Sequence, residues 1–336
     1  MLNNSSQINL SGKEVLVTGA AGFVASHLVD KLLEMGARVI GVDNFITGRK
    51  INLSRSPKFV FIEADVIEEP SSYLINPDRG VNLPKFDYVF HLASPASPPR
   101  YQENPKVTYR VNSLGTDRLL EYIEKECPEA KFVYASSSEV YGDPEIHPQT
   151  EDYWGNVNPN GPRACYDEGK RMGETICGVY TRNDGLDIRI ARIFNTYGPR
   201  IDPDDGRVIS NFVKQALADQ PITIYGDGSQ TRSYCFVSDL VEGLIKLATN
   251  PDAKGETVNL GNPDEHTILN TARKIWLIVQ GTDIDSDNIQ YMNLPSDDPT
   301  RRQPNITKAR NLLSWSPKVS FDTGIKKTVE WFRNNE

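Results

Sequence analysis

The sequence predicts an α/β protein with a Rossmann-like, doubly wound parallel sheet and a smaller C-terminal domain. Three features of its 336 residues predict this fold. Short apolar runs alternate with stretches of helical spacing up to about residue 195, which favours a parallel sheet with right-handed crossovers. A glycine turn joins the first apolar run to the first helical stretch. Beyond residue 195 turns and short pieces replace the alternation, which indicates a second, smaller unit.

The first predicted unit is a strand, a glycine turn and a helix. Residues 14–18 contain a short apolar run, which is typical of a buried strand. Gly19 and Gly22 follow, and residues 23–33 show helical spacing, with Gly36 where a helix C-terminal glycine belongs. This context is typical of a dinucleotide fingerprint. In it, Gly19 permits the tight turn and Gly22 lets the backbone approach a pyrophosphate at the helix start.

Asp43 ends the second predicted strand, residues 38–43. An acidic residue at this distance from the glycine turn meets the adenosine ribose hydroxyls and repels a 2′-phosphate. The sequence therefore favours NAD over NADP, although Arg49, close by, leaves NADP open. The alternative is a turn with two glycines and an aspartate that caps the next element.

Further strands and helices follow in alternation. Strands are expected at 58–63, 87–92, 131–135, 187–193 and 256–260, and helices at 103–126 and 162–183. Ser238 and Thr267 are expected to cap two later helices. Ligands of such sheets bind at the carboxyl ends of the strands, so residues that follow those ends should meet in one cleft. These residues are Asp65, Ala93, Ser94 and 136–139.

Tyr166 and Lys170 are candidates for catalysis. They are four residues apart, so on a helix they lie on one face. A cationic ammonium beside a phenol lowers the pKa of the phenol, which makes a tyrosine usable as a proton acceptor near neutral pH. Ser137 and Glu139 could complete a site that deprotonates an alcohol, and alcohol deprotonation suggests hydride transfer to a nucleotide cofactor. Taken alone, the pair also fits an exposed helical face.

The composition argues against several other classes of protein. Lys and Arg number 37 against 45 Asp and Glu, a net charge of −8, and no basic stripe suggests nucleic-acid binding. No apolar run approaches the length of a membrane span, and residues 1–10 lack a signal-peptide core. The four cysteines and four histidines show no metal-ligand spacing. We therefore expect no metal, reduced thiols and a cytoplasmic location.

The glycine turn, the acid at Asp43 and the Tyr-x-x-x-Lys pair together resemble the extended short-chain dehydrogenase/reductase superfamily over nearly the whole chain. Within it, the chain is most similar to the UDP-glucuronate decarboxylases, also called UDP-xylose synthases. The segments that carry this likeness are 43–50, 91–99, 139–144, 158–171, 191–200, 205–208, 228–232, 259–263 and 297–299.

This resemblance implies a redox-neutral reaction with NAD as the cofactor. C4 of UDP-glucuronate is oxidised, carbon dioxide leaves the resulting β-keto acid, and return of the hydride gives UDP-xylose. In this scheme Tyr166 takes the C4 hydroxyl proton, Lys170 positions the cofactor ribose and Ser137 polarises the C4 oxygen. Glu139 and Arg302 handle the sugar ring, its carboxylate and the return of a proton, because a guanidinium suits a carboxylate.

The resemblance also implies binding residues, domains and an oligomeric state. The cofactor-binding residues, besides Tyr166 and Lys170, are Gly19, Gly22, Phe23, Val24, Asp43, Asn44, Thr47, Gly48, Asp65, Val66, Ala93 and Ser94. The substrate-binding residues are Asn195, Arg207, Tyr225 and Arg232. Residues 10–195 with 235–262 are expected to form an NAD-binding domain, and 196–234 with 263–336 a nucleotide-sugar-binding domain. In relatives, the helices near 103–126 and 162–183 pair across a two-fold axis, so a homodimer is expected.

Three alternative functions stay open. A nucleotide-sugar 4-epimerase tends to have a small residue at the position of Glu139. A 4,6-dehydratase usually has an Asp-Glu pair, where this chain has Ser138 before Glu139. A non-enzymatic NAD-binding regulator needs the nucleotide cleft but not Ser137, Tyr166 and Lys170 together.

Overall fold

A seven-stranded parallel sheet forms the centre of the fold. The computed structural model describes residues 8–75, 85–294 and 301–335. The strands of the sheet are β1 (Glu14–Thr18), β2 (Arg38–Asp43), β3 (Phe59–Glu63), β4 (Tyr88–His91), β5 (Lys131–Ser137), β6 (Asp187–Ile193) and β11 (Thr257–Leu260). Their order is β11-β6-β5-β4-β1-β2-β3, with every neighbouring pair parallel. The predicted doubly wound parallel sheet is confirmed.

The observed strands lie close to the expected ranges. β5 extends furthest beyond its prediction and reaches Ser137, because residues 135–137 still pair with β6. The strand expected to rejoin the sheet is β11, which pairs with β6. The segment 297–299, which contributes to the family likeness, lies outside the described residues.

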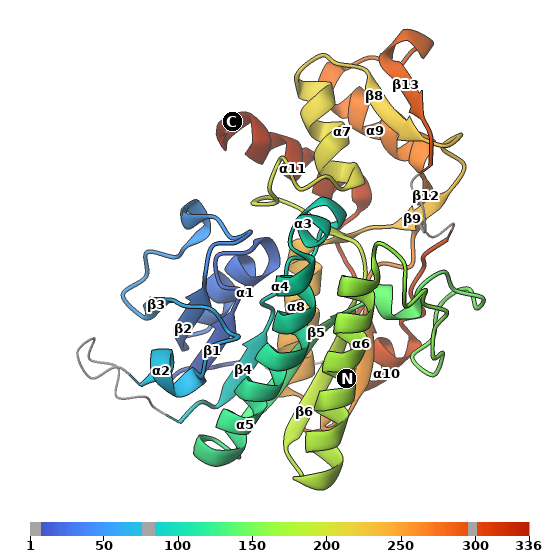
Figure 1. The fold of residues 1–336 in the computed structure, drawn as a ribbon. Helices are drawn as coiled ribbons and strands as arrows, with labels where there is room; N and C mark the ends of the chain where they lie inside the picture. The colour runs from blue at the N-terminus through green and yellow to red at the C-terminus, as the bar shows by residue number, and fades with distance from the viewer. Residues whose placement is uncertain (1–7, 76–84, 295–300, 336) are drawn as a thin grey trace, which may run out of the picture.

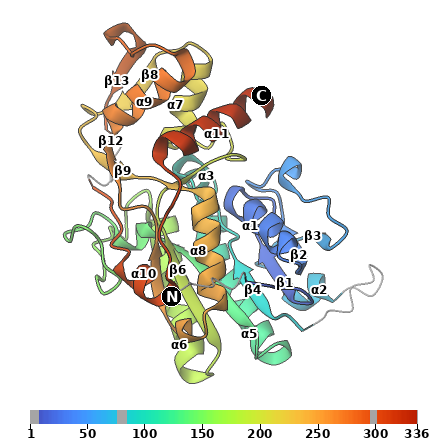
Figure 2. The ribbon, with the colours of Figure 1, turned by 180° about the vertical axis from the view of Figure 1, so that it is seen from behind.

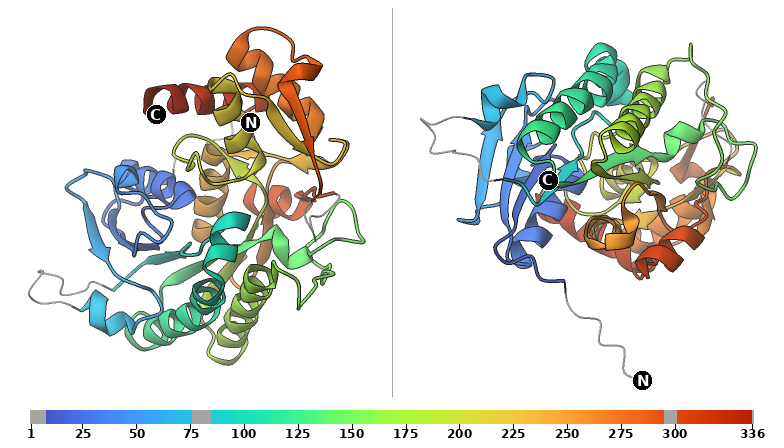
Figure 3. Two further views of the ribbon diagram at one scale, coloured as in Figure 1. Left: turned by 45° about the horizontal axis from the view of Figure 1, so that its top comes forward. Right: turned by 90° about the horizontal axis from the view of Figure 1, so that it is seen from below.

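Helices cover both faces of the sheet (Figures 1 and 2). One face carries α1 (Phe23–Glu34) and α8 (Val237–Thr249), and the other carries α4 (Pro105–Arg110), α5 (Thr116–Glu126) and α6 (Ala164–Asn183). The right-hand view of Figure 3 separates the two helical layers. Alternate residues of a strand point to opposite faces. Accordingly, Val15 and Val17 belong to the apolar core under α1 and α8, and Leu16 belongs to the core under α5 and α6.

The helix expected at 103–126 is interrupted. α4 and α5 flank a π-helical turn, η3 (Val111–Gly115). α4 begins with Pro105, whose missing N–H costs nothing in the first turn of a helix. The helical spacing predicts the helices on both sides, but a single period does not show the inserted turn.

One of the two expected helix caps is wrong. Ser238 lies inside α8, which begins one residue earlier, with Phe236 as its N-cap. Thr267 does cap α9 (Ile268–Gln280), because its hydroxyl accepts the backbone N–H of Asn270 at 3.0 Å. Ser238 carries a favourable cap residue type, but the preceding β10 strand (Cys235–Phe236) sets where the helix starts.

A second group of elements lies above the carboxyl edge of the sheet in Figure 1. It contains α7 (Val208–Leu217), β8 (Ile222–Tyr225), β9 (Thr231–Ser233), β12 (Glu265–Thr267), α9, β13 (Ile289–Met292) and α11 (Phe321–Asn335). β8 pairs with β13, and β9 with β12. β7 (Thr196–Tyr197) pairs with β10 where the chain passes between the two groups. α10 (Thr307–Leu313) returns to the side of the sheet, where Asn250 donates to the carbonyl of Leu312 at 2.6 Å.

Three further findings bear on the expected class of protein. Within the described ranges, no helix is both long enough and apolar enough to span a bilayer. All four cysteines are free, and three of them are buried. Among the residues that the structure describes, no group of three His, Cys, Asp or Glu side chains is arranged to hold a metal ion.

Candidate active site

A cavity of about 610 Å³ opens at the carboxyl edge of the sheet. It lies beside the neighbouring strands β1 and β4, where the strand order changes direction, which is the usual ligand site of such sheets. A smaller hollow of about 60 Å³ shares the glycine turn with it. All the expected catalytic and substrate-binding residues line the larger cavity: Ser137, Glu139, Tyr166, Lys170, Asn195, Arg207, Tyr225, Arg232 and Arg302.

The glycine turn after β1 lines both spaces. Gly19 has a φ of +73°, and a Cβ there would lie 2.9 Å from backbone atoms of Ala93, so the turn requires glycine. Gly22 is the N-cap of α1, and no side chain caps the helix start. The first N–H groups of α1 are therefore available, at the positive end of the helix dipole, beside Phe23 and Val24, which line the cavity. This arrangement fits a dinucleotide pyrophosphate.

Asp43 ends β2 at the smaller hollow. Its carboxylate accepts the backbone N–H of Ala21 at 3.0 Å and that of Phe45 at 2.7 Å, and burial raises its pKa. Each carboxylate oxygen can accept a further hydrogen bond, which suits ribose hydroxyls. Gly48 lines neither space. It packs on Asp43, and a Cβ at Gly48 would lie 2.8 Å from the carboxylate.

The other expected cofactor-binding residues line the smaller hollow. They come from the ends of neighbouring strands: Asn44, Thr47, Asp65, Val66, Ala93 and Ser94. The side-chain amide of Asn44 donates to Asp65 at 3.1 Å. Asp65, Ala93 and Ser94 thus meet at this hollow, and Ser94 also lines the larger cavity together with residues 136–139, so the expected convergence extends over two adjoining spaces.

Tyr166 lies in the first turn of α6 with only 5% of its surface exposed. Burial raises the pKa of Tyr166 to about 12, although its hydrogen bond with Ser137 and the charge of Arg207 act in the opposite direction. The expectation that the protein's own groups lower the pKa of this phenol is therefore wrong. Tyr166 and Lys170 do lie on one helix as their spacing predicts, but the desolvation of the phenol outweighs the hydrogen bond with Ser137 and the charge of Arg207.

Lys170 is held behind the phenol. Its Nζ donates to the carbonyl of Ala135 at 2.7 Å and lies 5.0 Å from the ring centre of Tyr134 and 5.7 Å from that of Tyr166. Burial lowers the pKa of Lys170 to about 7. The amine therefore exchanges its proton close to neutral pH, and the end of β5 fixes its position.

Glu139 lies between two guanidinium groups. Arg163 donates to one of its carboxylate oxygens at 2.5 Å, and Arg302 donates to the other. Burial alone would raise the pKa of Glu139, but the charges of Arg302 and Arg163 outweigh it and lower the pKa. Asp167 lies 4.0 Å from Nε of Arg163, and burial together with the charge of Glu139 raises its pKa. Glu139 is thus a fixed anion that holds two cations in place.

One N–H group of the Arg302 side chain makes no hydrogen bond within the part of the chain that the structure describes. Its Nη2 donates to the carbonyl of Gly142 at 3.1 Å, and its Nη1 binds Glu139. Its Nε is buried and has no partner among the described residues. An unsatisfied buried N–H is costly, so this group is suited to a ligand that accepts it. The side chain lines the cavity, and the natural acceptor for a guanidinium is an anionic oxygen.

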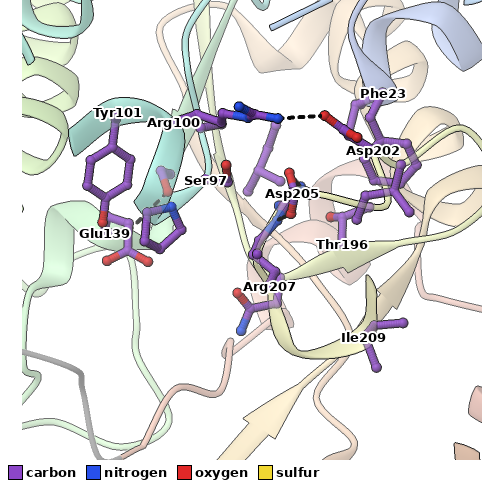
Figure 4. Close-up of a pocket in the computed structure, with 18 of the residues that line it drawn as sticks. Phe23, Ser97, Arg100, Tyr101, Glu139, Thr196, Asp202, Asp205, Arg207 and Ile209 are labelled. Carbon is purple, nitrogen blue, oxygen red and sulfur yellow. Dashed lines mark hydrogen bonds and ion pairs between the residues drawn. The ribbon is translucent and has the colours of Figure 1, made fainter. Parts of the chain in front are cut away.

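More arginines line the cavity away from Glu139. In Figure 4, Arg207 and Asp205 lie across the cavity from Tyr101 and Glu139. Arg207 donates to both oxygens of Asp205, and its Nη2 bond measures 3.1 Å. Arg232 also lines this cavity and is 9% exposed. These cations suit a diphosphate group.

Comparison with known proteins places this site in a family. A sequence family described as the NAD dependent epimerase/dehydratase family matches residues 15–261. The chain belongs to this family. Within the family, the chain is 48% identical over 323 residues to UDP-glucuronic acid decarboxylase 1 of Danio rerio, covering 95% of this chain and 72% of that protein. It is 50% identical over 328 residues to UDP-glucuronic acid decarboxylase 2 of Arabidopsis thaliana, covering 96% and 68%.

A solved structure of a family member has a similar fold. UDP-glucuronic acid 4-epimerase from Bacillus cereus, in complex with UDP-glucuronic acid and NAD, superposes with a TM-score of 0.81. The two chains are 30% identical, over 96% of this chain and 99% of that one. The family resemblance inferred from the sequence, and its particular likeness to UDP-glucuronate decarboxylases, are confirmed.

Three residues of this site escape the sequence patterns. Arg163 and Asp167 are four residues apart at the start of a predicted helix, and this spacing indicates only an ion pair between them. It does not indicate that Arg163 also binds Glu139, which is visible only in the folded structure. Tyr101 gives no sequence signal. Its place against Tyr166 depends on how α3 (Pro98–Glu103) packs on α6.

Proposed function

We propose that this protein is a UDP-glucuronic acid decarboxylase, which uses NAD to convert UDP-glucuronate to UDP-xylose through a 4-keto intermediate. The observation that carries the proposal is that Arg302, whose Nε is unpartnered among the described residues, lines the same cavity as Tyr166. Arg302 suits the carboxylate that the reaction removes, and Tyr166 suits the hydroxyl that it oxidises. The relatives that are 48–50% identical to the chain support the same function.

The residues present fit NAD. The Gly19 turn and the start of α1 would hold the pyrophosphate, Asp43 the adenosine ribose, and Lys170 the nicotinamide ribose. The carboxylate of Asp43 disfavours a 2′-phosphate at that ribose, so NADP fits less well. Bound NAD⁺ supplies a positively charged ring that takes a hydride from C4 and later returns it.

Tyr166 is the proposed acceptor of the C4 hydroxyl proton. Its own surroundings leave the pKa of Tyr166 near 12, so proton acceptance near neutral pH requires a further positive charge beside the phenol. Ser137, which hydrogen-bonds with Tyr166, is placed to polarise the C4 oxygen at the same time. Loss of the hydride and the proton makes C4 a ketone.

Arg302 is the proposed anchor of the sugar carboxylate, and Glu139 holds Arg302 in place. Once C4 is a ketone, the C5 carboxyl group belongs to a β-keto acid. The bond to that group then breaks, and its electron pair delocalises into the carbonyl. We propose that the proton that C5 takes up afterwards passes through the cluster of charged side chains formed by Glu139, Asp167 and the two arginines that bind Glu139. Asn195, Arg207, Arg232 and Tyr225 are proposed to bind the nucleotide and its diphosphate.

We also propose that two copies associate through α4, η3 and α6. α4 and α6 lie next to each other on one face of the sheet (Figure 1). Large apolar side chains are exposed on them: Tyr109 is 43%, Leu114 40%, Met172 51% and Val179 40% exposed. Met172 and Val179 are seven residues apart and therefore share a helix face. A second copy, with the same face turned toward the first, would bury all of them.

The domain boundaries and the location stay predictions. We propose that residues 10–195 with 235–262 bind NAD, and that 196–234 with 263–336 bind the nucleotide sugar. The position of the cavity between the sheet and the upper group of elements supports this division. The cytoplasmic location rests on the free cysteines, and cell fractionation tests it.

Incubation of the purified protein with NAD and UDP-glucuronate tests the proposed function. Release of carbon dioxide together with formation of UDP-xylose is the expected result, and Tyr166→Phe should lower kcat by about 1000-fold or more. An epimerase would instead give a UDP-hexuronate, and a dehydratase would give a deoxy-keto sugar in a parallel incubation with a neutral nucleotide sugar. Either product without carbon dioxide, or no product at all, contradicts the proposal.

A further inference from the structure

We infer that Tyr101 is a positioning residue for catalysis: its ring, stacked on that of Tyr166, holds the phenol where it accepts the proton. This inference rests on the proposed function and adds a residue that acts on substrate only through Tyr166. The argument comes from ring geometry, the place of Tyr166 in its helix, and the fixed position of α3.

The two rings form a parallel stack. Their centroids are 5.0 Å apart, and their planes differ by 9°. Tyr101 is 1% exposed and Tyr166 5% exposed, so the stack is shielded from solvent. Offset stacking of aromatic rings is favourable and restricts the relative orientation of the rings. A parallel neighbour therefore limits rotation of the Tyr166 ring out of its plane.

Tyr166 needs such a neighbour because the hydrogen bonds of its backbone and its hydroxyl do not set the plane of its ring. It lies in the first turn of α6, where its backbone N–H donates to the carbonyl of the N-cap residue Arg163 at 2.9 Å, and this bond fixes the backbone but not the plane of the ring. The hydrogen bond with Ser137 fixes only the tip of the side chain. The Nζ of Lys170 lies 5.7 Å from the ring centre and donates its hydrogen bond to the carbonyl of Ala135, so it makes no hydrogen bond that sets the plane of the ring.

Tyr101, by contrast, is fixed from several directions. α3 begins with Pro98 and Pro99, and the N–H of Tyr101 donates to the carbonyl of Ser97 at 3.0 Å. Next to Tyr101, Arg100 donates to Asp202 at 3.2 Å, the bond drawn as a dashed line in Figure 4. α3 is thus tied to the segment that leads to Arg207, on the far wall of the cavity.

The ring of Tyr101, and not its hydroxyl, accounts for this arrangement. The hydroxyl is buried and has no hydrogen-bond partner among the described residues, so it does not anchor the side chain. Tyr101 also lines the cavity beside Glu139. A Phe at this position keeps the stack, whereas a Leu keeps apolar volume but removes the aromatic face.

Steady-state kinetics of Tyr101→Leu and Tyr101→Phe test the inference. We expect Tyr101→Leu to lower kcat by about tenfold to 100-fold, because ~1 Å of misplacement can cost ~100-fold in rate. Its KM and its affinity for NAD should change by less than about threefold, since the role lies in orientation. Tyr101→Phe should restore kcat to within about threefold of the wild type. Equal losses for the two variants, or no loss for Tyr101→Leu, overturn the inference.

A double-mutant cycle with Tyr166→Phe gives a readout that a merely structural role would not move. If Tyr101 acts only by orienting the Tyr166 hydroxyl, adding Tyr101→Leu to Tyr166→Phe should change the residual rate by less than about twofold. Two full, additive losses contradict the inference. Wild-type protein that releases no carbon dioxide contradicts the proposed function instead, so the two failures are distinguishable.

Tyr153→Leu is the matched control. Tyr153 stacks on Tyr141 with centroids 6.0 Å apart and planes 14° apart, and neither ring lines the cavity. Its loss removes a similar aromatic pair elsewhere in the same region, and kcat should stay within about twofold of the wild type. A fall in kcat as large as that of Tyr101→Leu would assign both effects to general loss of packing and overturn the inference.

Discussion

The two halves of the cavity are built in different ways. The cofactor half is built from the carboxyl ends of strands and the start of α1: Gly19 sets the turn after β1, and Asp43 ends β2. The sugar half joins Glu139, Arg163 and Arg302, and the last of these is 163 residues from Glu139. The first half depends on backbone conformation and helix ends, and the second on buried charges brought together by tertiary packing.

This difference predicts which substitutions should disturb only the contacts of the replaced residue and which should also disturb neighbouring side chains. In the cofactor half, backbone N–H groups hold the carboxylate of Asp43, so its loss should stay local. In the sugar half, each charge is compensated by the others, so one removal leaves a buried ion without its partner. Breaking a buried ion pair by removing one member typically costs ~3–5 kcal/mol. Substitutions in the two halves should therefore differ in size as well as in the ligand they affect.

Arg302→Leu should have the largest effect. It removes the proposed anchor of the substrate carboxylate, so we expect kcat/KM for UDP-glucuronate to fall by about 1000-fold, which corresponds to ~4 kcal/mol of lost transition-state binding. NAD affinity, measured by calorimetry, should stay within about threefold of the wild type, because Arg302 lies outside the cofactor half. Arg301→Leu is the control, since its side chain is exposed. A matching loss in both variants, or a large loss of NAD affinity with Arg302→Leu, would break the comparison.

Asp43→Asn should have an intermediate effect, confined to the cofactor. The amide keeps the size of the side chain and an acceptor for Ala21 but loses the charge that meets the ribose and repels a 2′-phosphate. We expect NAD to bind about tenfold more weakly, with little change in the KM for the sugar. The ratio between the affinities for NAD and for NADP should become smaller. Titration of the protein with each nucleotide measures the two affinities. Asp87→Asn is the control, because Asp87 lies at the amino ends of the strands, beside the start of β1. An unchanged preference would rule out the proposed ribose contact.

Charges on the proposed dimer face should have the smallest effect on chemistry. The double variant Met172→Lys and Val179→Lys places two charges where a second copy would bury apolar surface, so light scattering should show a shift from dimer to monomer. Turnover per chain should fall by less than about fivefold, because neither side chain lines the cavity. Leu277→Lys, on exposed surface of α9, should leave the mass unchanged. If light scattering finds the wild-type protein to be a monomer, the proposed dimer is wrong.

The same contrast explains how far the sequence could predict this molecule. β1, α1 and β2 match their expected ranges, and Gly19 and Asp43 lie as expected, because a local pattern encodes them. The pKa of Tyr166 could not be predicted, since burial, which decides its direction, belongs to the fold and not to the spacing to Lys170. The prediction that Ser238 caps a helix is wrong for a similar reason, because the position of the preceding strand, and not the residue type, sets where α8 begins.

The charges of the sugar half show where local patterns end. The likeness to a family points to Glu139 and Arg302, but not to the arrangement in which Arg163 shares the carboxylate. That arrangement depends on contacts between segments far apart in the chain, which no window of residues contains. The interrupted helix at η3 is a further instance, because helical spacing continues on both sides of the extra turn.

The path of the chain limits how the protein can move. After β6 it leaves the sheet for α7, comes back as α8 and β11, leaves for α9, returns as α10 and ends in α11. Several covalent links therefore join the two walls of the cavity, and any movement of one wall against the other must bend all of these links together. One cut of the backbone would therefore not release either wall.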